Sequence, residues 1–116
     1  MAMKPQLVKL LEAMKALGLK PMHELSPVDA RAQMEAGVKA RNLPPIELGS
    51  VEEQSVPGPD GDIPVRVYRP EGAEGLLGAL VYYHGGGHVI GSMDTHDSVA
   101  RAMCRDANIV VLSVDY

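Results

Sequence analysis

The chain has 116 residues, of which 46% are hydrophobic and 22% charged; this is the mix of one globular domain and excludes a disordered, collagen-like or coiled-coil chain. A net charge of −4 and only four aromatic residues, all Tyr, argue against a nucleic-acid partner. The single cysteine, Cys104, excludes an internal disulfide framework and a cysteine-based zinc site.

The N-terminal residues include Lys9, Glu12 and Lys15, unlike the uncharged apolar run of a secretory leader. The longest stretch without Asp, Glu, Lys or Arg is 75–93, and it contains six Gly. Open backbone of that kind cannot cross lipid. We therefore expect a soluble, cytoplasmic protein with no membrane partner.

Two short helices are predicted, over 4–17 and 26–42. In the first, Leu and Met recur at three- and four-residue spacing, and Gly18 is a natural stop. The second begins with Ser26 as the capping residue and Pro27 at the first helical position. The plainest interpretation is a pair of helices that pack on a core.

A β-hairpin is predicted next. Residues 47–54 form an extended segment, 57–62 are dense in Pro, Gly and Asp and predict a turn, and the second strand ends at Arg69. In that strand, Ile and Val alternate with Arg66 and Tyr68, which indicates one apolar face.

The C-terminal part predicts a strand, helix, strand crossover. Residues 79–83 and 109–114 are apolar runs without alternation, which suits strands buried on both faces of a parallel sheet. Residues 95–107 predict the helix between them, capped by Asp94 or Thr95. We expect Cys104 to be a small buried hydrophobe on that helix, and Arg101 and Arg105 to form its solvated face.

Two parallel strands covered by one helix leave one face and both sheet edges bare. Tyr116 follows a buried-type strand with no turn or polar tail. We therefore expect the chain to be the N-terminal portion of a larger α/β protein.

The strand at 79–83 runs directly into His84-Gly85-Gly86-Gly87-His88. Consecutive glycines after a buried strand let the backbone approach another group closely. One function for such a loop is an oxyanion hole, in which backbone N–H groups stabilise the negative charge that develops on a carbonyl oxygen during acyl transfer.

Two other chemistries compete for the same residues. Gly85, Gly87 and Gly91, with Asp115 after the next strand, resemble a dinucleotide-binding pattern, but the following helix starts several residues too late to hold a pyrophosphate. A metal site would use His84, His88 and His96, but two of these flank a glycine loop instead of lying on a helix face, and no carboxylate partner is placed. A P-loop is excluded because no Gly-Lys-Ser/Thr follows.

Three segments together resemble the hormone-sensitive-lipase-type esterases, the bacterial "family IV" α/β-hydrolases. The segments are Tyr82 to Gly87, Gly91 to Asp97, which includes Asp94-Thr95-His96-Asp97, and Ile109 to Tyr116, which closes with Val114-Asp115-Tyr116. The resemblance implies an α/β-hydrolase fold with a mixed, mostly parallel sheet. Residues 1–45 would form N-terminal cap (lid) helices, and 46–116 would form the first strands and first crossover helix of the core.

The resemblance also implies carboxylic-ester hydrolysis by a Ser-Asp/Glu-His triad without a cofactor. Gly86 and Gly87 match the oxyanion-hole glycines, Gly85 shapes the loop, and His84 anchors it by hydrogen bonding. His88 departs from the family pattern, in which this position is often aromatic or small, and is a candidate substrate-binding residue.

The catalytic nucleophile of this fold sits in a G-x-S-x-G elbow. None of the six serines (26, 50, 55, 92, 98 and 113) has Gly two residues before and two after. Because nucleophile, acid and base all follow the oxyanion loop in this fold, we expect the triad beyond residue 116 and the chain alone to be inactive.

The expected substrates are short or medium acyl esters, bound partly by Met and Leu of the lid helices. The expected partner is the remainder of the same hydrolase, and a homodimer is left open. Two other functions stay open: an oxidoreductase that binds a nucleotide cofactor, and a hydrolase-like binding module without turnover.

Overall fold

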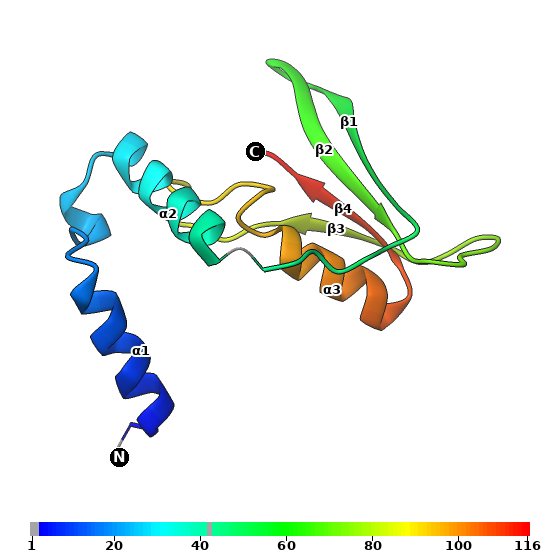
Figure 1. The fold of residues 1–116 in the computed structure, drawn as a ribbon. Helices are drawn as coiled ribbons and strands as arrows, with labels where there is room; N and C mark the ends of the chain where they lie inside the picture. The colour runs from blue at the N-terminus through cyan, green and yellow to red at the C-terminus, as the bar shows by residue number, and fades with distance from the viewer. Residues whose placement is uncertain (1–2, 42) are drawn as a thin grey trace.

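The computed structural model describes residues 3–41 and 43–116. The element order is α1 (Pro5–Ala16), the 3₁₀ turn η1 (Met22–Glu24), α2 (Pro27–Arg41), β1 (Ser50–Gly58), β2 (Gly61–Arg69), β3 (Ala79–Tyr83), α3 (Asp97–Ala107) and β4 (Val110–Val114). The predicted elements are therefore all present, in the predicted order (Figure 1). Residue 42, where the second helix was predicted to end, lies outside the described residues.

The four described strands form one mixed sheet in the order β1-β2-β4-β3. β4 lies inside the sheet, antiparallel to β2 and parallel to β3. The predicted crossover from β3 through α3 to β4 is therefore confirmed. Within the described strands, parallel pairing is confined to β3 and β4. Their register places Tyr83 beside Val114, so the segments after both strands leave the sheet at the same edge.

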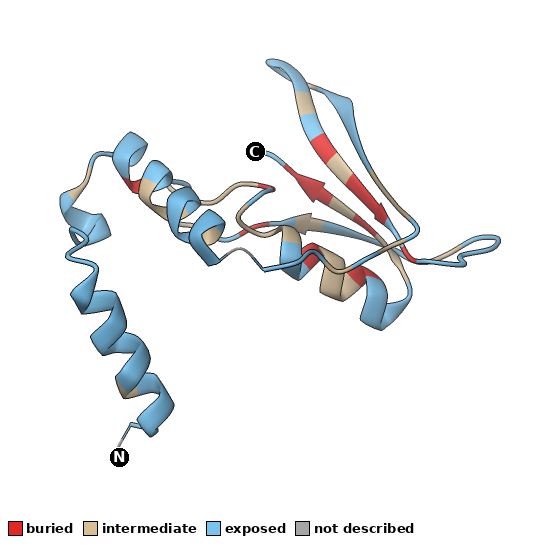
Figure 2. Ribbon diagram, in the orientation of Figure 1, coloured by how far each residue is buried: buried red, intermediate tan, exposed pale blue. Residues whose placement is uncertain are grey.

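The core lies on both faces of β2 and β4. On one face Tyr68 and Val111 pack with Ala100 and Cys104 of α3. On the other face the buried cluster consists of valines, namely Val65, Val67 and Val114. Figure 2 shows this burial concentrated in β2, β4 and the inner side of α3. The prediction that Cys104 is buried is confirmed, and burial raises the pKa of its thiol.

The hairpin turn is tighter than predicted. β1 and β2 stay paired as far as Gly58 and Gly61, so Pro57 and Asp62 belong to strands and not to the turn. Pro57 is tolerated there because β1 is an edge strand, where a missing N–H costs no ladder bond. Tyr68 lies on the opposite face from Val65 and Val67, as the alternation predicts. That second face is also buried, and Tyr68 is fully covered beneath α3.

β3 was predicted to be buried on both faces, and this is wrong. Val81 and Tyr83, which share one face of β3, are more than half exposed, because no helix among the described elements packs on that face. A continuous apolar run is typical of a strand with both faces covered, and the described residues leave one face of β3 uncovered.

The start of α3 also differs from the prediction. The helix begins at Asp97, and its N-cap residue, His96, makes no side-chain capping bond. Neither Asp94 nor Thr95 caps the helix; the Thr95 hydroxyl instead accepts a hydrogen bond from the Ser92 amide at 2.8 Å.

A network of charged side chains joins this helix start to β2. Arg66 bonds Glu53 at 2.6 Å and Asp94 at 2.8 Å. The Tyr68 hydroxyl donates to Asp97 at 2.9 Å, and Arg101 bonds the same carboxylate at 2.6 Å. Arg101 was predicted to be solvated; only 17% of its side chain is exposed, because it serves this network.

Burial would lower the pKa of Arg66, but its hydrogen bonds to Glu53 and Asp94 outweigh that effect and hold the pKa above its ordinary value. Arg66 therefore remains charged and joins the hairpin to the segment that leads into α3.

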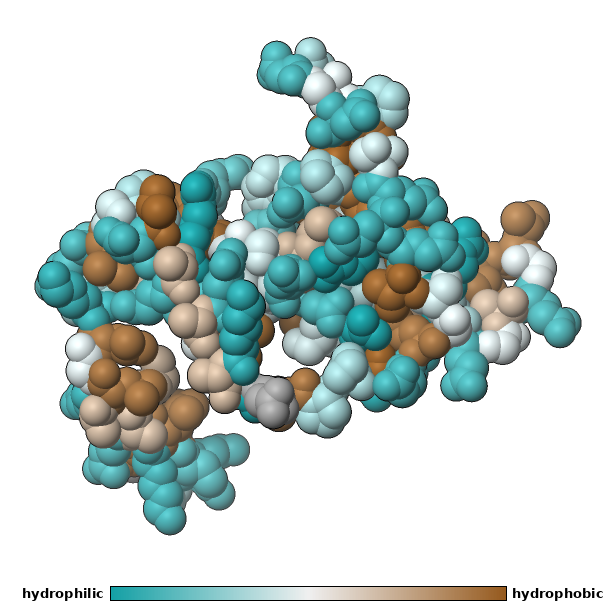
Figure 3. Space-filling view, turned by 45° about the horizontal axis from the view of Figure 1, so that its top comes forward, coloured by the Kyte–Doolittle hydropathy of each residue, from teal (hydrophilic) through white to brown (hydrophobic). Residues whose placement is uncertain are grey.

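The two N-terminal helices differ from the predicted core-packing pair. Ser26 does cap α2, since its hydroxyl oxygen accepts from the Asp29 amide at 3.2 Å. However, α1 has no buried residue and α2 has one, Ala30. Figure 3 shows apolar surface gathered over α1. Among the described residues, no helix is long and apolar enough to cross a bilayer.

We predict that Tyr68→Phe lowers the free energy of unfolding at pH 7 by about 1.5–3 kcal/mol, because it removes a hydrogen bond to a carboxylate. Burial and the bond to Asp97 raise the pKa of Tyr68 above the ordinary 10.0. Its contribution is therefore intact below about pH 10 and is lost as the pH rises beyond that.

Urea unfolding of the chain at pH 7 and pH 10.5 measures both effects. Tyr83→Phe, at a 63% exposed position, is the matched control. Equal alkaline loss of stability in wild type and Tyr68→Phe would contradict the assignment.

Candidate functional site

The glycine segment, residues 84–88, lies where β3 leaves the sheet, beside the end of β4. His84 is buried, with 5% of its surface exposed. Its ring stacks on Tyr116 at 4.7 Å and on His96 at 5.1 Å between centroids. The Tyr116 hydroxyl donates a hydrogen bond to the His84 carbonyl. Tyr116, just after β4, therefore holds both the ring and the main chain of His84, and His96 at the start of α3 packs on the ring.

The His84 imidazole in turn holds the next residue. Its Nδ1 lies 2.9 Å from the Gly85 carbonyl oxygen. Because a carbonyl oxygen only accepts, Nδ1 carries the proton. The Nε2 atom is buried and has no partner among the described residues. With Nδ1 donating and Nε2 enclosed, His84 is positioned to fix the loop and not to take a proton from a substrate.

The Gly86 carbonyl is held as well. It accepts hydrogen bonds from the amides of Val89 and Ile90, each at 3.1 Å, and these close a tight turn over 86–90. A Cβ on Gly86 would lie 1.7 Å from the Ile90 carbonyl oxygen, so only glycine permits this approach.

These two held carbonyls orient two amides. In a planar trans peptide, a carbonyl and the following N–H point in opposite directions. Since the Gly85 carbonyl faces the His84 ring, the Gly86 N–H points away from that ring. Since the Gly86 carbonyl faces the turn, the Gly87 N–H points away from the turn. Within the described residues neither amide donates a hydrogen bond.

Gly91 completes the arrangement from the other side. It has φ +100°, and a Cβ there would lie 2.6 Å from His84 Nδ1 and 2.7 Å from the Gly85 oxygen. The backbone of Gly91 thus packs directly on the hydrogen bond between His84 and Gly85. His88 has φ +58°, a left-handed conformation that is uncommon for a residue with a side chain, and its ring meets Tyr116 edge-on at 5.9 Å.

A groove of about 440 Å³ lies beside this segment. Gly86 and Gly87 are not among its lining residues, although their neighbours on both sides are. It is lined by Arg31, His84, His88, Val89, Ile90, Gly91, Asp115 and Tyr116.

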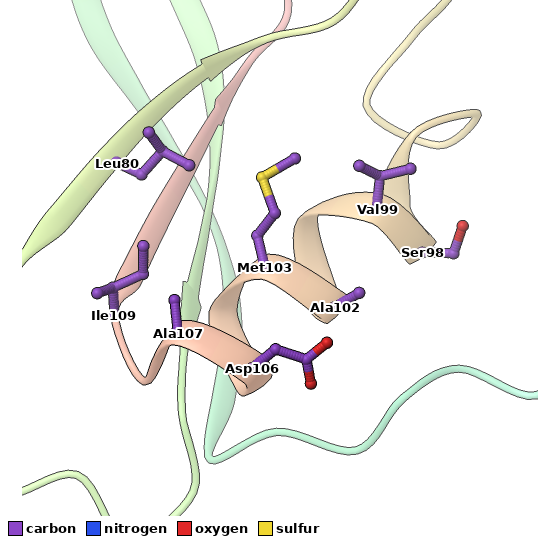
Figure 4. A pocket seen from close by; sticks show the side chains of 8 residues that line it. All are labelled: Leu80, Ser98, Val99, Ala102, Met103, Asp106, Ala107 and Ile109. Carbon is purple, nitrogen blue, oxygen red and sulfur yellow. The ribbon is translucent and has the colours of Figure 1, made fainter.

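A larger hollow of about 640 Å³ lies between α3 and β3 (Figure 4). Its wall is mainly apolar and includes Leu80, Val99 and Met103, with Asp106 at its rim. Its lining has one hydroxyl, that of Ser98, and no imidazole. The smaller groove has two imidazoles and a carboxylate in its lining, and the oriented Gly86 and Gly87 amides belong to the segment beside it, so it is the chemical candidate.

The two rival chemistries gain no support from this geometry. Among residues 3–41 and 43–116, no group of three His, Cys, Asp or Glu is arranged to hold a metal ion. His84 and His96 stack face to face and do not converge on one point. For a dinucleotide, α3 would have to open at the glycines; it opens only at Asp97.

Four residues of the groove were not singled out for a role from the sequence, and two of them, Tyr116 and Arg31, make directed contacts with the glycine segment or the turn that follows it. Tyr116 could have been placed beside His84, because parallel strands ending at Tyr83 and Val114 bring the following residues together. For Arg31, whose Nε donates to the Val89 carbonyl at 2.6 Å, no sequence signal exists, since the two residues are far apart in the chain.

Residues 80–116 match the α/β-hydrolase fold family. The carboxylic ester hydrolase LipN of Mycobacterium tuberculosis is 51% identical over 77% of this chain and 23% of its own length. The ethyl acetate hydrolase of Pseudomonas putida is 36% identical over 100% of this chain and 39% of its own length.

Solved structures give the same result. An ester hydrolase from the metagenome of Lake Arreo, in complex with a bipyridine phosphonate derivative, superposes with a TM-score of 0.86 and 34% identity over 99% of this chain and 38% of its own. The hyperthermophilic esterase of Pyrobaculum calidifontis superposes with a TM-score of 0.83 and 39% sequence identity; the match covers 100% of this chain and 37% of that esterase. The chain thus spans at most about two-fifths of the length of these relatives.

We predict that Gly91→Ala lowers the free energy of unfolding by about 3 kcal/mol, because the new methyl group collides with the His84 ring in addition to straining the backbone. Gly75→Ala is the matched control, since Gly75 also has positive φ (+72°) but open space around it; strain alone costs about 1–2 kcal/mol there. Urea unfolding compares the two, and equal losses would show that Gly91 does not pack on His84.

Proposed function

Because this chain belongs to the α/β-hydrolase family, among its hormone-sensitive-lipase-like esterases, we propose that it supplies the oxyanion hole of a carboxylic ester hydrolase. The observation that carries the proposal is the pair of held carbonyls at Gly85 and Gly86, which directs the next two amides away from every acceptor in residues 3–41 and 43–116. An ester carbonyl that binds beside these amides gains negative charge on its oxygen as a nucleophile attacks.

In the proposed mechanism a serine attacks the ester carbonyl and forms an acyl-enzyme, which water then hydrolyses. The Gly86 and Gly87 amides donate to the oxyanion in both steps. Because these donors are fixed before the substrate arrives, no reorganisation opposes the reaction. Serine, acid and base are proposed to lie outside these 116 residues, since the sequence has no G-x-S-x-G elbow.

The acyl group is proposed to be short or medium in length. The names of two relatives, the ethyl acetate hydrolase of Pseudomonas putida and an acetyl esterase of Salmonella, support a short acyl group. The ring of His88, at the rim of the groove, is proposed to contact the substrate. The exposed apolar side chains of α1 and α2, including Leu10, Met14 and Val28, are proposed to belong to a lid formed by 1–45. A cytoplasmic location and a homodimer stay predictions from the sequence.

The proposal is tested in a chimera in which residues 1–116 replace the aligned segment of the Pyrobaculum calidifontis esterase. We expect the chimera to hydrolyse p-nitrophenyl acetate and to lose activity after treatment with a serine-directed phosphonate. The 116-residue chain alone is expected to be inactive. A folded chimera that binds the phosphonate reversibly but does not turn over the ester would favour a binding module instead.

Within the chimera, Gly87→Ala is predicted to lower kcat by about a hundredfold. Its methyl group lies beside the Gly87 N–H and keeps the oxyanion from approaching that donor, and the loss of one such donor costs about that much. Gly72→Ala is the matched control: its φ of +65° is close to the +61° of Gly87, and both positions are open. The two variants should lose similar stability, and only Gly87→Ala should lose rate. Equal rates in the two variants would argue against Gly87 as an oxyanion donor.

A further inference from the structure

The cap helix α2 meets the glycine segment through one directed bond. The Arg31 Nε–H donates to the Val89 carbonyl oxygen at 2.6 Å, a short distance of the kind found when the donor is charged. The neighbouring Ala30 is 2% exposed, so α2 is seated at this point, while the Arg31 side chain itself remains exposed. A substitution at Arg31 can therefore remove the bond without opening the core.

The Val89 carbonyl is linked to the Gly87 amide through two peptide groups and one hydrogen bond. The Val89 carbonyl shares a planar peptide with the Ile90 N–H, which donates to the Gly86 carbonyl at 3.1 Å. The Gly86 carbonyl shares the next planar peptide with the Gly87 N–H. A continuous series thus runs from the Arg31 guanidinium through Val89–Ile90 and Gly86–Gly87 to the free Gly87 amide.

Such a series has two physical effects. It fixes the plane of each peptide, because each is held at its carbonyl end. It also polarises each group in the same sense, since hydrogen bonds in a chain strengthen one another by about 10–30% per bond. A positive charge at the start of the series draws electron density away from the far end, which makes the Gly87 N–H a stronger donor.

From this geometry we propose that Arg31 is a positioning residue of the site, which orients and polarises the Gly87 amide through the turn. The inference rests on the proposed function for its catalytic consequence, but the coupling between Arg31 and the Gly87 amide stands apart from it. It assigns α2 a second role besides the lid proposed above: the oxyanion donor is fully set only when α2 is seated.

The test compares Arg31→Met, Arg31→Lys and Arg41→Met in the chimera. Arg41 is an exposed arginine of the same helix and serves as the control for lost charge. We expect Arg31→Met to lower kcat about tenfold, a part of the loss for a whole donor, with KM within about twofold of the parent. Arg31→Lys keeps a charged donor and should restore most of the rate, and Arg41→Met should match the parent.

A second readout is the amide resonance of Gly87 in the 116-residue chain labelled with ¹⁵N-glycine. Arg31→Met should move it upfield, because the less polarised N–H proton is less deshielded, and Arg41→Met should leave it unchanged. Identical Gly87 resonances and kcat values for the two methionine variants would overturn the proposal, as would a loss of rate in Arg31→Lys as deep as in Arg31→Met.

The two proposals fail in different ways. A folded chimera without ester hydrolysis contradicts the proposed function, while a shifted Gly87 resonance in Arg31→Met still supports the coupling. Hydrolysis that is insensitive to Arg31, with an unmoved Gly87 resonance, supports the proposed function and contradicts the coupling.

Discussion

The direction of the Gly86 and Gly87 amides depends on where the two preceding carbonyls are held. His84 Nδ1 holds the Gly85 carbonyl at 2.9 Å, and the amides of Val89 and Ile90 hold that of Gly86. Peptide planarity converts these bonds into two N–H groups directed away from the ring and from the turn. Under the proposed function, these donors are set before any substrate binds, which is what makes an oxyanion hole effective.

The rest of the described chain supports the His84 ring. β3 and β4 end side by side, so Tyr116 can stack on the ring and bond its carbonyl. His96, at the start of α3, also stacks on the His84 ring. The start of α3 is fixed there because Asp97 accepts a hydrogen bond from Tyr68 of β2. A buried network on one sheet face thus determines the geometry of an exposed loop.

The sequence was sufficient for the order of elements and for the α/β-hydrolase resemblance, because periodicity, Gly and Pro positions, and the His-Gly-Gly-Gly segment are local signals. It was insufficient where tertiary neighbours decide. Tyr68 looked like a polar-face residue, yet Asp97 and Arg101 from α3 give its hydroxyl and ring a buried environment. The exposure of β3 and the bond from Arg31 to Val89 likewise depend on contacts between distant segments, which no local pattern encodes.

The most direct measurement is a crystal structure of the chimera with the Pyrobaculum calidifontis esterase after reaction with a serine-directed phosphonate, whose phosphonyl oxygen mimics the oxyanion. The account predicts this oxygen at about 2.7–3.1 Å from both the Gly86 and Gly87 nitrogen atoms. A phosphonyl oxygen bound elsewhere, with either glycine presenting its carbonyl to the ligand, would contradict the account.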